Sequence, residues 1–205
     1  MSPACASTAK TEGQRRLGDL TEALQDLARQ LQESRSELVA AVVDHEAPAA
    51  GPLLVVEDTT RALGSLAAAY RMTLGARIVG VAGSNGKTTT KEMLAHLLGR
   101  DRRIVKAHGS FNNHVGVPLT IFSATGETEI AVLEIGTNHP GEIARLGEIA
   151  RPDLAVIVSI GAEHLEGLGS LEGVADEECT LLEHLRGGGK AVVHHDPRIL
   201  SRMKL

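Results

Sequence analysis

The chain has 205 residues, 42% of them hydrophobic, which is sufficient for one α/β domain with an appendage. Its formal net charge of −5 and its aromatic content of 1% argue against a nucleic-acid surface or a base-stacking platform. The two cysteines form no disulfide or zinc framework, and no apolar run is long enough to cross a bilayer. We therefore expect a cytoplasmic protein without nucleic-acid or membrane partners.

The first fifty residues have a composition of their own. Residues 1–16 are small, polar and charged, which predicts disorder. Residues 17–47 are predicted to form an amphipathic helix, because leucines recur at spacings of three and four (Leu17, Leu20, Leu24, Leu27, Leu31 and Leu38). Such a helix either docks on its own domain or forms a short coiled coil that makes the chain a homodimer, and the sequence leaves both open. The Pro- and Gly-containing residues 48–52 indicate a linker and a domain boundary.

From residue 53 to residue 205, strand patterns alternate with helix patterns. Strands are expected at 53–56, 78–82, 104–106, 130–135, 154–160 and 191–193. Helices are expected from Asp58 or Thr59, from Lys87 to Gly99, through Leu119 and Ile121, and at 141–150 and 170–185. This alternation predicts an α/β fold with a mostly parallel sheet wrapped by helices on both faces. Ligands are then expected at the carboxyl ends of the strands.

A glycine loop joins the strand at 78–82 to the following helix. Gly83, Ser84, Asn85 and Gly86 break the apolar run, and Lys87, Thr88 and Thr89 open the helix. Loop amides and a helix N-terminus bind phosphates, while Lys87 would reach the outer phosphates of ATP and Thr88 would contact Mg²⁺. The loop is shorter than the general pattern, which has glycine where this chain has Val81. The alternative is a glycine-rich turn followed by an unrelated Lys-Thr pair.

Three further groups follow strand patterns and are candidate site residues. Glu134 lies at the end of a buried strand, where a carboxylate needs a partner such as a metal ion or a Lys or Arg, and we favour the metal. His164 follows the next strand pattern, although a single loop histidine is usually solvated. Asn112 and Asn113 are turn formers by default.

Four sequence blocks resemble, in order, the central ATPase domain of the Mur ligase family, in particular its MurF type. They are G-S-N-G-K-T-T-T-K-E-M-L at 83–94, G-S-F-N-N-H-V-G-V-P-L-T at 109–120, E-I-G-T-N-H-P-G-E-I at 134–143 and H-L-E-G-L-G-S-L-E-G-V-A at 164–175. The resemblance implies that Lys87 and Thr88 hold ATP and Mg²⁺ and that Glu134 and His164 serve the metals. It places Asn112, Asn113 and Asn138 in loops on the substrate side.

The resemblance also implies a reaction, namely ATP-dependent amide bond formation through an acyl phosphate in peptidoglycan precursor synthesis, with a UDP-muramoyl peptide as partner. Lys87 and His164 would be its catalytic residues. The family has a carbamoylated lysine at the position of Glu178, so Glu178 is expected to serve as a metal ligand instead. A leucine-stripe helix stands where the family has a UDP-sugar domain, and the sequence ends before the amino-acid domain. We expect this chain alone not to complete amide formation.

Two alternatives to a ligase core stay open. The chain is either a non-catalytic ATP-binding or dimerising module derived from a Mur ligase, or an unrelated P-loop kinase or ATPase. The later sequence blocks argue against the second of these. ATP turnover in the presence of an acceptor carboxylate would separate the first from a ligase.

Overall fold

The computed structural model describes residues 40–45 and 52–203, and the chain divides into two compact units between Glu57 and Asp58. In the first unit, β1 (Ala41–Val43) pairs in parallel with β2 (Leu53–Val55), with Ala41 opposite Leu53. The prediction of a helix to residue 47 is therefore wrong at 41–43. Two consecutive β-branched valines favour an extended backbone there, and the paired strand satisfies its polar groups.

The predicted boundary also differs from the division that the structure makes. Residues 53–56 were expected to open the nucleotide-binding domain, but β2 pairs with β1 and the second unit starts at Asp58. The predicted disorder at 1–16, the leucine-stripe helix over 17–39, its homodimer and most of the 48–52 linker lie outside the described residues. They stay predictions.

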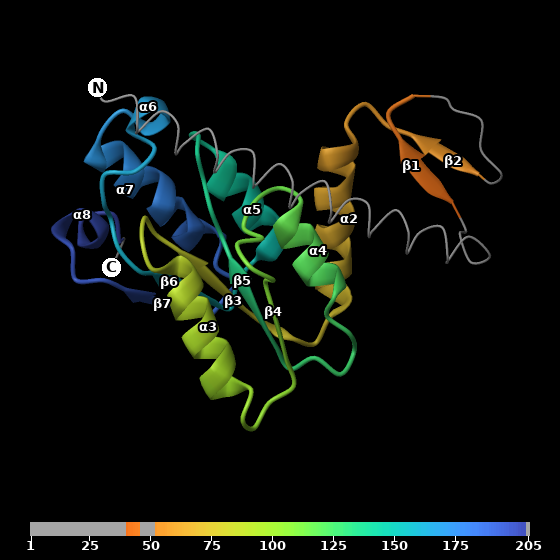
Figure 1. The fold of residues 1–205 in the computed structure, drawn as a ribbon, viewed down its shortest axis with the longest axis horizontal. Coiled ribbons are helices and arrows are strands. Elements are labelled where there is room, and N and C mark those ends of the chain that lie inside the picture. The colour runs from red at the N-terminus through yellow and green to blue at the C-terminus, as the bar shows by residue number, and fades with distance from the viewer. Residues whose placement is uncertain (1–39, 46–51, 204–205) are drawn as a thin grey trace, which may run out of the picture. The chain divides into compact units, whose positions relative to one another are not determined.

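The second unit is built on a five-stranded sheet, shown in Figure 1, with the order β4-β5-β3-β6-β7 and every neighbouring pair parallel. The strands are β3 (Arg77–Ala82), β4 (Ile104–Lys106), β5 (Ile130–Glu134), β6 (Leu154–Ile157) and β7 (Lys190–Val193). The chain moves from β3 to the β4 edge and then returns strand by strand across the sheet. The predicted parallel α/β fold is confirmed.

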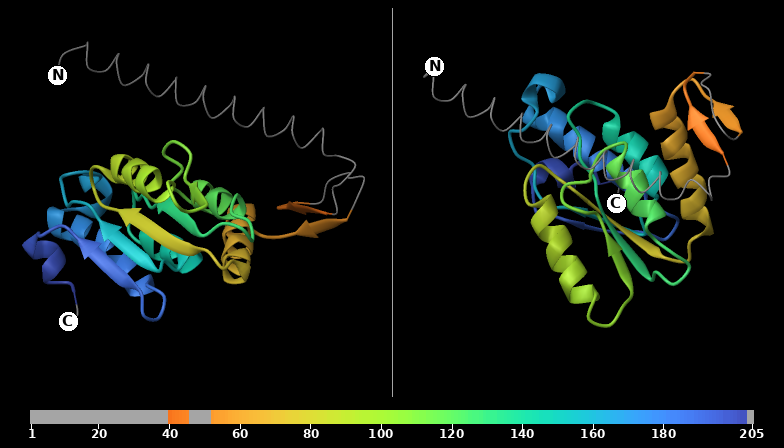
Figure 2. Two further views of the ribbon diagram at one scale, coloured as in Figure 1. Left: turned by 90° about the horizontal axis from the view of Figure 1, so that it is seen from below. Right: turned by 45° about the vertical axis from the view of Figure 1, so that its right-hand side comes forward.

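Helices enclose this sheet, as the two further views in Figure 2 show. They are α2 (Thr59–Thr73), α3 (Lys87–Leu98), α4 (Gly116–Phe122), α5 (Glu142–Ala150), α6 (Leu165–Leu168), α7 (Leu171–Cys179), the 3₁₀ helix η1 (Thr180–His184) and α8 (Pro197–Leu200). Asp58 caps α2 by accepting the Arg61 amide at 2.9 Å, as its position in the sequence predicted.

The alternating residues of β3 divide the core between the two faces of the sheet. Ile78 and Ala82 pack into a large cluster that includes residues of α2, α4, α5 and α7. Val79 and Val81 face a smaller cluster on the other side, against Leu94 of α3. Because β3 is buried on both faces, it reads as a continuous apolar run. It is the central strand on which the site is built.

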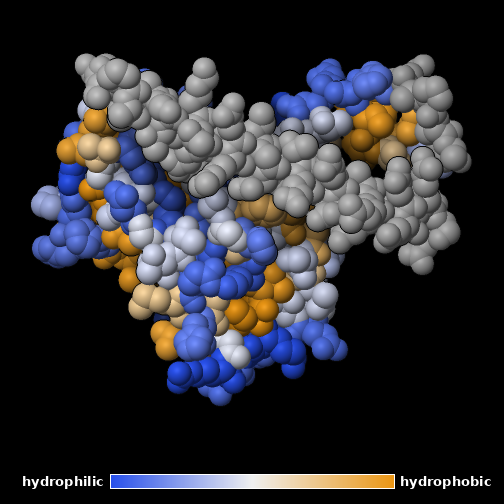
Figure 3. All heavy atoms as spheres, viewed as in Figure 1, coloured by the Kyte–Doolittle hydropathy of each residue, from blue (hydrophilic) through white to orange (hydrophobic). Residues whose placement is uncertain are grey.

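Several predicted helix details differ from the structure. The helix expected at 170–185 ends at Cys179 and continues as η1, while α6 and α8 were not predicted. The apolar spacing that predicts α3 includes Met93 and Leu97, but both are exposed, and the buried residues of the helix are Lys91 and Ala95. Within the described part of the chain, no helix is long and apolar enough to cross a membrane. The face in Figure 3 is mixed, with hydrophobic patches interrupted by hydrophilic residues.

Candidate functional site

The glycine loop after β3 has a backbone that only glycine fits well. Gly83 has φ of 120° and Gly86 has φ of 85°. A Cβ atom on Gly83 would lie 2.9 Å from backbone atoms of Val158 and Ser159. The loop is tied to the segment after β6, because the Ser84 amide donates to the Ser159 carbonyl at 2.9 Å. The Ser84 hydroxyl also accepts the Gly161 amide at 2.8 Å.

The helix that follows this loop starts without a side-chain cap. Gly86 precedes α3 in the left-handed conformation, and no side chain accepts the first amides of the helix. Uncapped amides and the helix dipole make such a terminus favourable for an anion. The predicted strand, loop and helix arrangement is therefore present in the structure.

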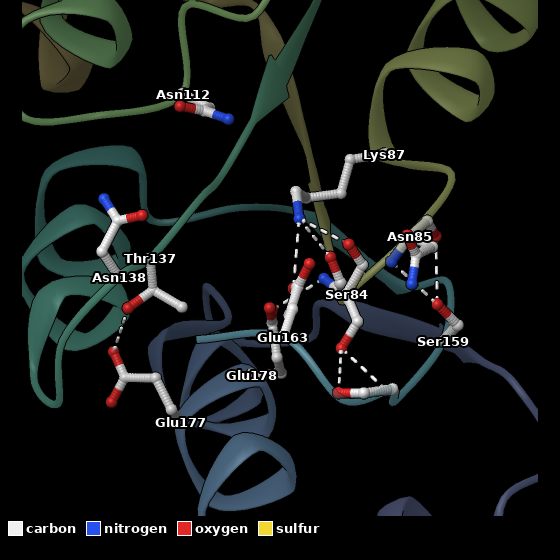
Figure 4. Close-up of polar contacts among 12 residues, drawn as sticks. Ser84, Asn85, Lys87, Asn112, Thr137, Asn138, Ser159, Glu163, Glu177 and Glu178 are labelled. Carbon is white, nitrogen blue, oxygen red and sulfur yellow. Dashed lines mark hydrogen bonds and ion pairs between the residues drawn. The ribbon is translucent and has the colours of Figure 1, made fainter. Parts of the chain in front are cut away.

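Lys87 lies over the loop that precedes it. Its ammonium group donates to the carbonyls of Gly83 and Ser84, the latter at 3.1 Å, and lies 3.6 Å from a carboxylate oxygen of Glu163 (Figure 4). The side chain is only 14% exposed. A cation of this kind beside uncapped helix amides adds to the attraction for phosphate groups.

Glu134 is the centre of a buried polar cluster at the end of β5. Its Oε2 accepts the Thr88 hydroxyl at 2.9 Å, and its Oε1 accepts the side-chain amide of Asn112 at 3.1 Å. Lys91, which is fully buried, lies 3.6 Å from Oε2 and also donates to the Gly109 carbonyl. The alternative to a metal partner, a Lys or Arg beside Glu134, is thus present, and it is Lys91. The favoured metal stays a prediction.

The Thr88 hydroxyl and the Glu134 carboxylate are oxygen donors side by side. Mg²⁺ commonly takes one or two protein oxygens and completes its shell with water and phosphate oxygens. Thr88 and Glu134 fit that requirement, although no group of three or more His, Cys, Asp or Glu arranged for a metal occurs in the described ranges. Lys91 places a positive charge 3.6 Å from the buried Glu134 carboxylate.

A cavity of about 100 Å³ lies beside Lys87. It gathers all three residues that the resemblance placed on the substrate side. The lining residues are Lys87, Asn112, Asn113, His114, Gly136, Thr137, Asn138, Glu142 and His164. This brings together the loops that follow β3, β4, β5 and β6, as the rule for parallel sheets predicts.

His164 and Asn113 contribute to this cavity in different ways. His164 lies at φ of 51°, immediately before α6, and within residues 52–203 its ring makes no hydrogen bond or ion pair with Glu134 or Glu178. Its expected metal role stays a prediction. Asn113 Oδ1 accepts the amides of Val115 and Gly116, so this residue also organises the start of α4.

Glu178 is fully buried behind the glycine loop. Its Oε2 accepts the Gly83 amide at 2.7 Å, while Oε1 has no hydrogen-bond partner in the described structure. Burial raises the pKa of this carboxyl to about 7, against the opposing effect of Lys87. The sequence did not predict the bond to Gly83, and the expected role of Glu178 as a metal ligand stays a prediction.

The sequence did not identify several residues of this site. They include four that line the cavity, His114, Gly136, Thr137 and Glu142, and three charged residues around it. Lys91 pairs with Glu134, Glu163 pairs with Lys87, and Glu177 accepts amides at the start of α5. Lys91 carried a usable signal, because it follows Lys87 by one helical turn. Glu163 and Glu177 carried no such signal, because in a sequence they cannot be distinguished from acidic residues on the surface.

The fold and site define a parallel α/β domain with a glycine loop and a cavity at the carboxyl ends of its central strands. Residues 81–205 match the model of the Mur ligase middle domain. The chain belongs to the Mur ligase family.

Its relatives include ligases of the MurF type. The chain is 46% identical over 149 residues to the UDP-N-acetylmuramoyl-tripeptide–D-alanyl-D-alanine ligase of Bacillus subtilis, covering 73% of this chain and 33% of that protein. The Escherichia coli ligase of the same name is 42% identical over 145 residues, covering 71% and 32%. The chain thus spans about a third of the length of these relatives.

A solved structure has the same fold. MurF from Thermotoga maritima in complex with ADP matches with a TM-score of 0.74 and 33% identity, covering 85% of this chain and 41% of that one. The resemblance to the Mur ligases and to their MurF type, expected from the sequence blocks, is confirmed.

Proposed function

We propose that this chain binds Mg-ATP at the glycine loop and acts as the nucleotide-binding part of an ATP-dependent amide ligase of the MurF type. The observation that carries the proposal is the geometry around α3. An uncapped helix N-terminus, Lys87 and the Thr88–Glu134 pair lie together at the carboxyl ends of β3 and β5. The T. maritima relative was solved in complex with ADP, which supports nucleotide binding by this chain.

Each group has a role in binding that its chemistry supports. The amides of residues 86–89 at the start of α3 would donate to phosphate oxygens, and the Lys87 ammonium would neutralise the outer phosphates. Thr88 and Glu134 would hold Mg²⁺, and His164 and Glu178 are further candidates near it. When bound, Mg²⁺ would offset the charge of the phosphates.

The names of the relatives support the choice of substrates, and the resemblance to the Mur ligases supports an acyl phosphate as the intermediate. The γ-phosphoryl group of ATP would pass to a carboxylate of a UDP-muramoyl tripeptide, releasing ADP, and the amine of D-alanyl-D-alanine would then displace phosphate to form the amide. The cavity beside Lys87 opens toward Asn112, Asn113 and Asn138, whose amides suit a carboxylate or peptide group. The protein's contribution would be positioning and neutralisation of charge.

A non-catalytic ATP-binding module is the second candidate, and Glu178 favours it. A glutamate stands here where the resemblance implies a carbamoylated lysine as a metal ligand, and its Oε2 is already bonded to the Gly83 amide. Release of phosphate from ATP only when UDP-muramoyl tripeptide is added would support the ligase. ATP binding without such turnover would support the module.

Calorimetric titration with Mg-ATP tests the nucleotide site. Lys87→Ala removes a charged donor, and hydrogen bonds to charged groups contribute about 1.5–3 kcal/mol, so we expect affinity to fall at least about tenfold. Lys190→Ala is the matched control. Lys190 is exposed and lies at the amino end of the edge strand β7, away from the carboxyl ends of β3 and β5 that form the site. Equal affinities for wild type and Lys87→Ala would reject the proposed site.

A further inference from the structure

Two adjacent carboxylates of α7 reach two different loops of the site. Glu178 accepts the amide of Gly83 in the glycine loop at 2.7 Å. Glu177 accepts the amides of Gly141 and Ile143, each at 2.8 Å, at the start of α5. Both side chains are buried, with exposed fractions of 0% for Glu178 and 7% for Glu177.

Glu177 supplies a cap that α5 lacks in its own sequence. Gly141 precedes α5 in the left-handed conformation and has no side chain to accept the first amides. Glu177 accepts two of them from a different helix. A carboxylate at a helix N-terminus is favourable both as an acceptor and through the helix dipole.

The loop held in this way forms one wall of the cavity. Gly136, Thr137 and Asn138 line it. The Thr137 hydroxyl lies 3.3 Å from Glu177, and Figure 4 shows the Asn138 side chain directed away from this carboxylate. Glu142 fixes the same loop from within, because it accepts the amides of Asn138 and His139 at 2.6 and 3.2 Å.

We propose that Glu177 is a positioning residue for the substrate side of the site, an inference that rests on the proposed function. It holds the 136–141 loop so that Asn138 faces the cavity. Its neighbour Glu178 holds the glycine loop, and the two residues share one rigid helix. α7 therefore sets the separation between the loop that receives the nucleotide and the loop that receives the carboxylate substrate.

Glu177→Gln keeps the shape of the side chain but turns one of its two acceptors into a donor facing a backbone amide. We expect amide hydrogen exchange of Gly141 and Ile143 to accelerate about tenfold, as for loss of one charge-assisted bond. Exchange in the 83–86 loop should stay within about twofold of wild type, as should Mg-ATP affinity. Glu183→Gln, an exposed glutamate of η1, is the control and should change neither region.

The functional measurement is calorimetric titration with UDP-muramoyl tripeptide in the presence of Mg-ADP. We expect Glu177→Gln to weaken tripeptide binding about tenfold while Mg-ATP affinity is retained, a split that general destabilisation would not produce.

Unchanged exchange at 141–143, equal loss of both affinities, or unchanged tripeptide affinity would each overturn the inference. If the wild-type protein binds Mg-ATP but no tripeptide, the inference about Glu177 is overturned as well, whereas the proposed nucleotide site is still supported. Failure of wild type to bind Mg-ATP instead rejects the proposed function, while the exchange data still decide whether Glu177 holds the loop.

Discussion

The hydroxyl of Thr88 donates to Glu134 across 2.9 Å, so the first turn of α3 is joined to the carboxyl end of β5. The two residues are 46 positions apart in the chain. They meet because β3 and β5 are neighbours in a parallel sheet and both end at the same edge. The pair sits beside the uncapped amides at the start of α3, where a bound triphosphate would bring its metal.

Thr88→Val tests this pair while preserving side-chain volume. The variant loses the hydroxyl, and we expect it to lose most of the increase in nucleotide affinity that Mg²⁺ gives the wild type. The measurement is calorimetric titration with ATP in Mg²⁺ and in EDTA. Thr90→Val, on the same helix but outside the site, is the control. If Mg²⁺ raises the affinity of Thr88→Val as much as that of wild type, Thr88 is not a metal ligand.

The buried ion pair of Lys91 and Glu134 makes a prediction about stability. Lys91→Met leaves Glu134 without its cation in the interior, and such a loss typically costs about 3–5 kcal/mol. Urea unfolding should show a reduced midpoint for Lys91→Met. Lys106→Met is the control, because Lys106 is 42% exposed and pairs with an exposed carboxylate, Glu92, so its loss should change stability little. A cost below about 1 kcal/mol for Lys91→Met would show that Thr88 and Asn112 alone satisfy Glu134.

Much of this site was predictable because its residues follow strands of one parallel sheet. The apolar run at 78–82 and the glycines after it located the loop, and Glu134 stood out as a carboxylate ending a buried strand. The carboxyl-end rule then placed these residues together without any knowledge of strand order. The fold class followed from the same alternation of patterns.

What the sequence did not predict depends on partners far apart in the chain. The helix pattern ran into residues 41–43, where pairing with β2 decides the conformation instead. Lys91 has the appearance of an exposed helix residue until Glu134 is placed beside it, and Glu177 that of any surface glutamate. Their burial depends on tertiary contacts that periodicity does not encode.

Gly83 provides a test of the loop backbone. Gly83→Ala introduces a Cβ atom 2.9 Å from backbone atoms of Val158 and Ser159, at a φ of 120° that side chains rarely adopt. Strain of this kind costs about 1–3 kcal/mol, and the clash adds to it. Thermal unfolding should show the loss. Gly126→Ala, where nothing lies within 4 Å, should stay within about 0.5 kcal/mol of wild type. Equal stability of the two variants would mean that the loop relaxes without cost.

The buried carboxyl of Glu178 predicts an unusual pH dependence. Its pKa is raised to about 7 by burial, compared with 4.5 for the ordinary side chain. Between these values the folded protein retains a proton that the unfolded chain has released. The stabilisation is therefore fully present below about pH 4.5 and is lost as pH rises to about 7, the opposite sense to a salt-bridged carboxylate.

Glu178→Gln should remove this dependence, because the amide does not titrate and its oxygen still accepts the Gly83 amide. At about 1.36 kcal/mol per unit of pKa shift, the difference in unfolding free energy between wild type and variant should change by about 3 kcal/mol from pH 4.5 to 8. Urea unfolding at four pH values in this range measures it. Glu183→Gln, which replaces an exposed glutamate, should keep the wild-type slope. If the unfolding free energies of wild type and Glu178→Gln change with pH in parallel, Lys87 keeps Glu178 ionised in the folded protein. A carboxylate that is already ionised at pH 5 has no proton to lose on unfolding.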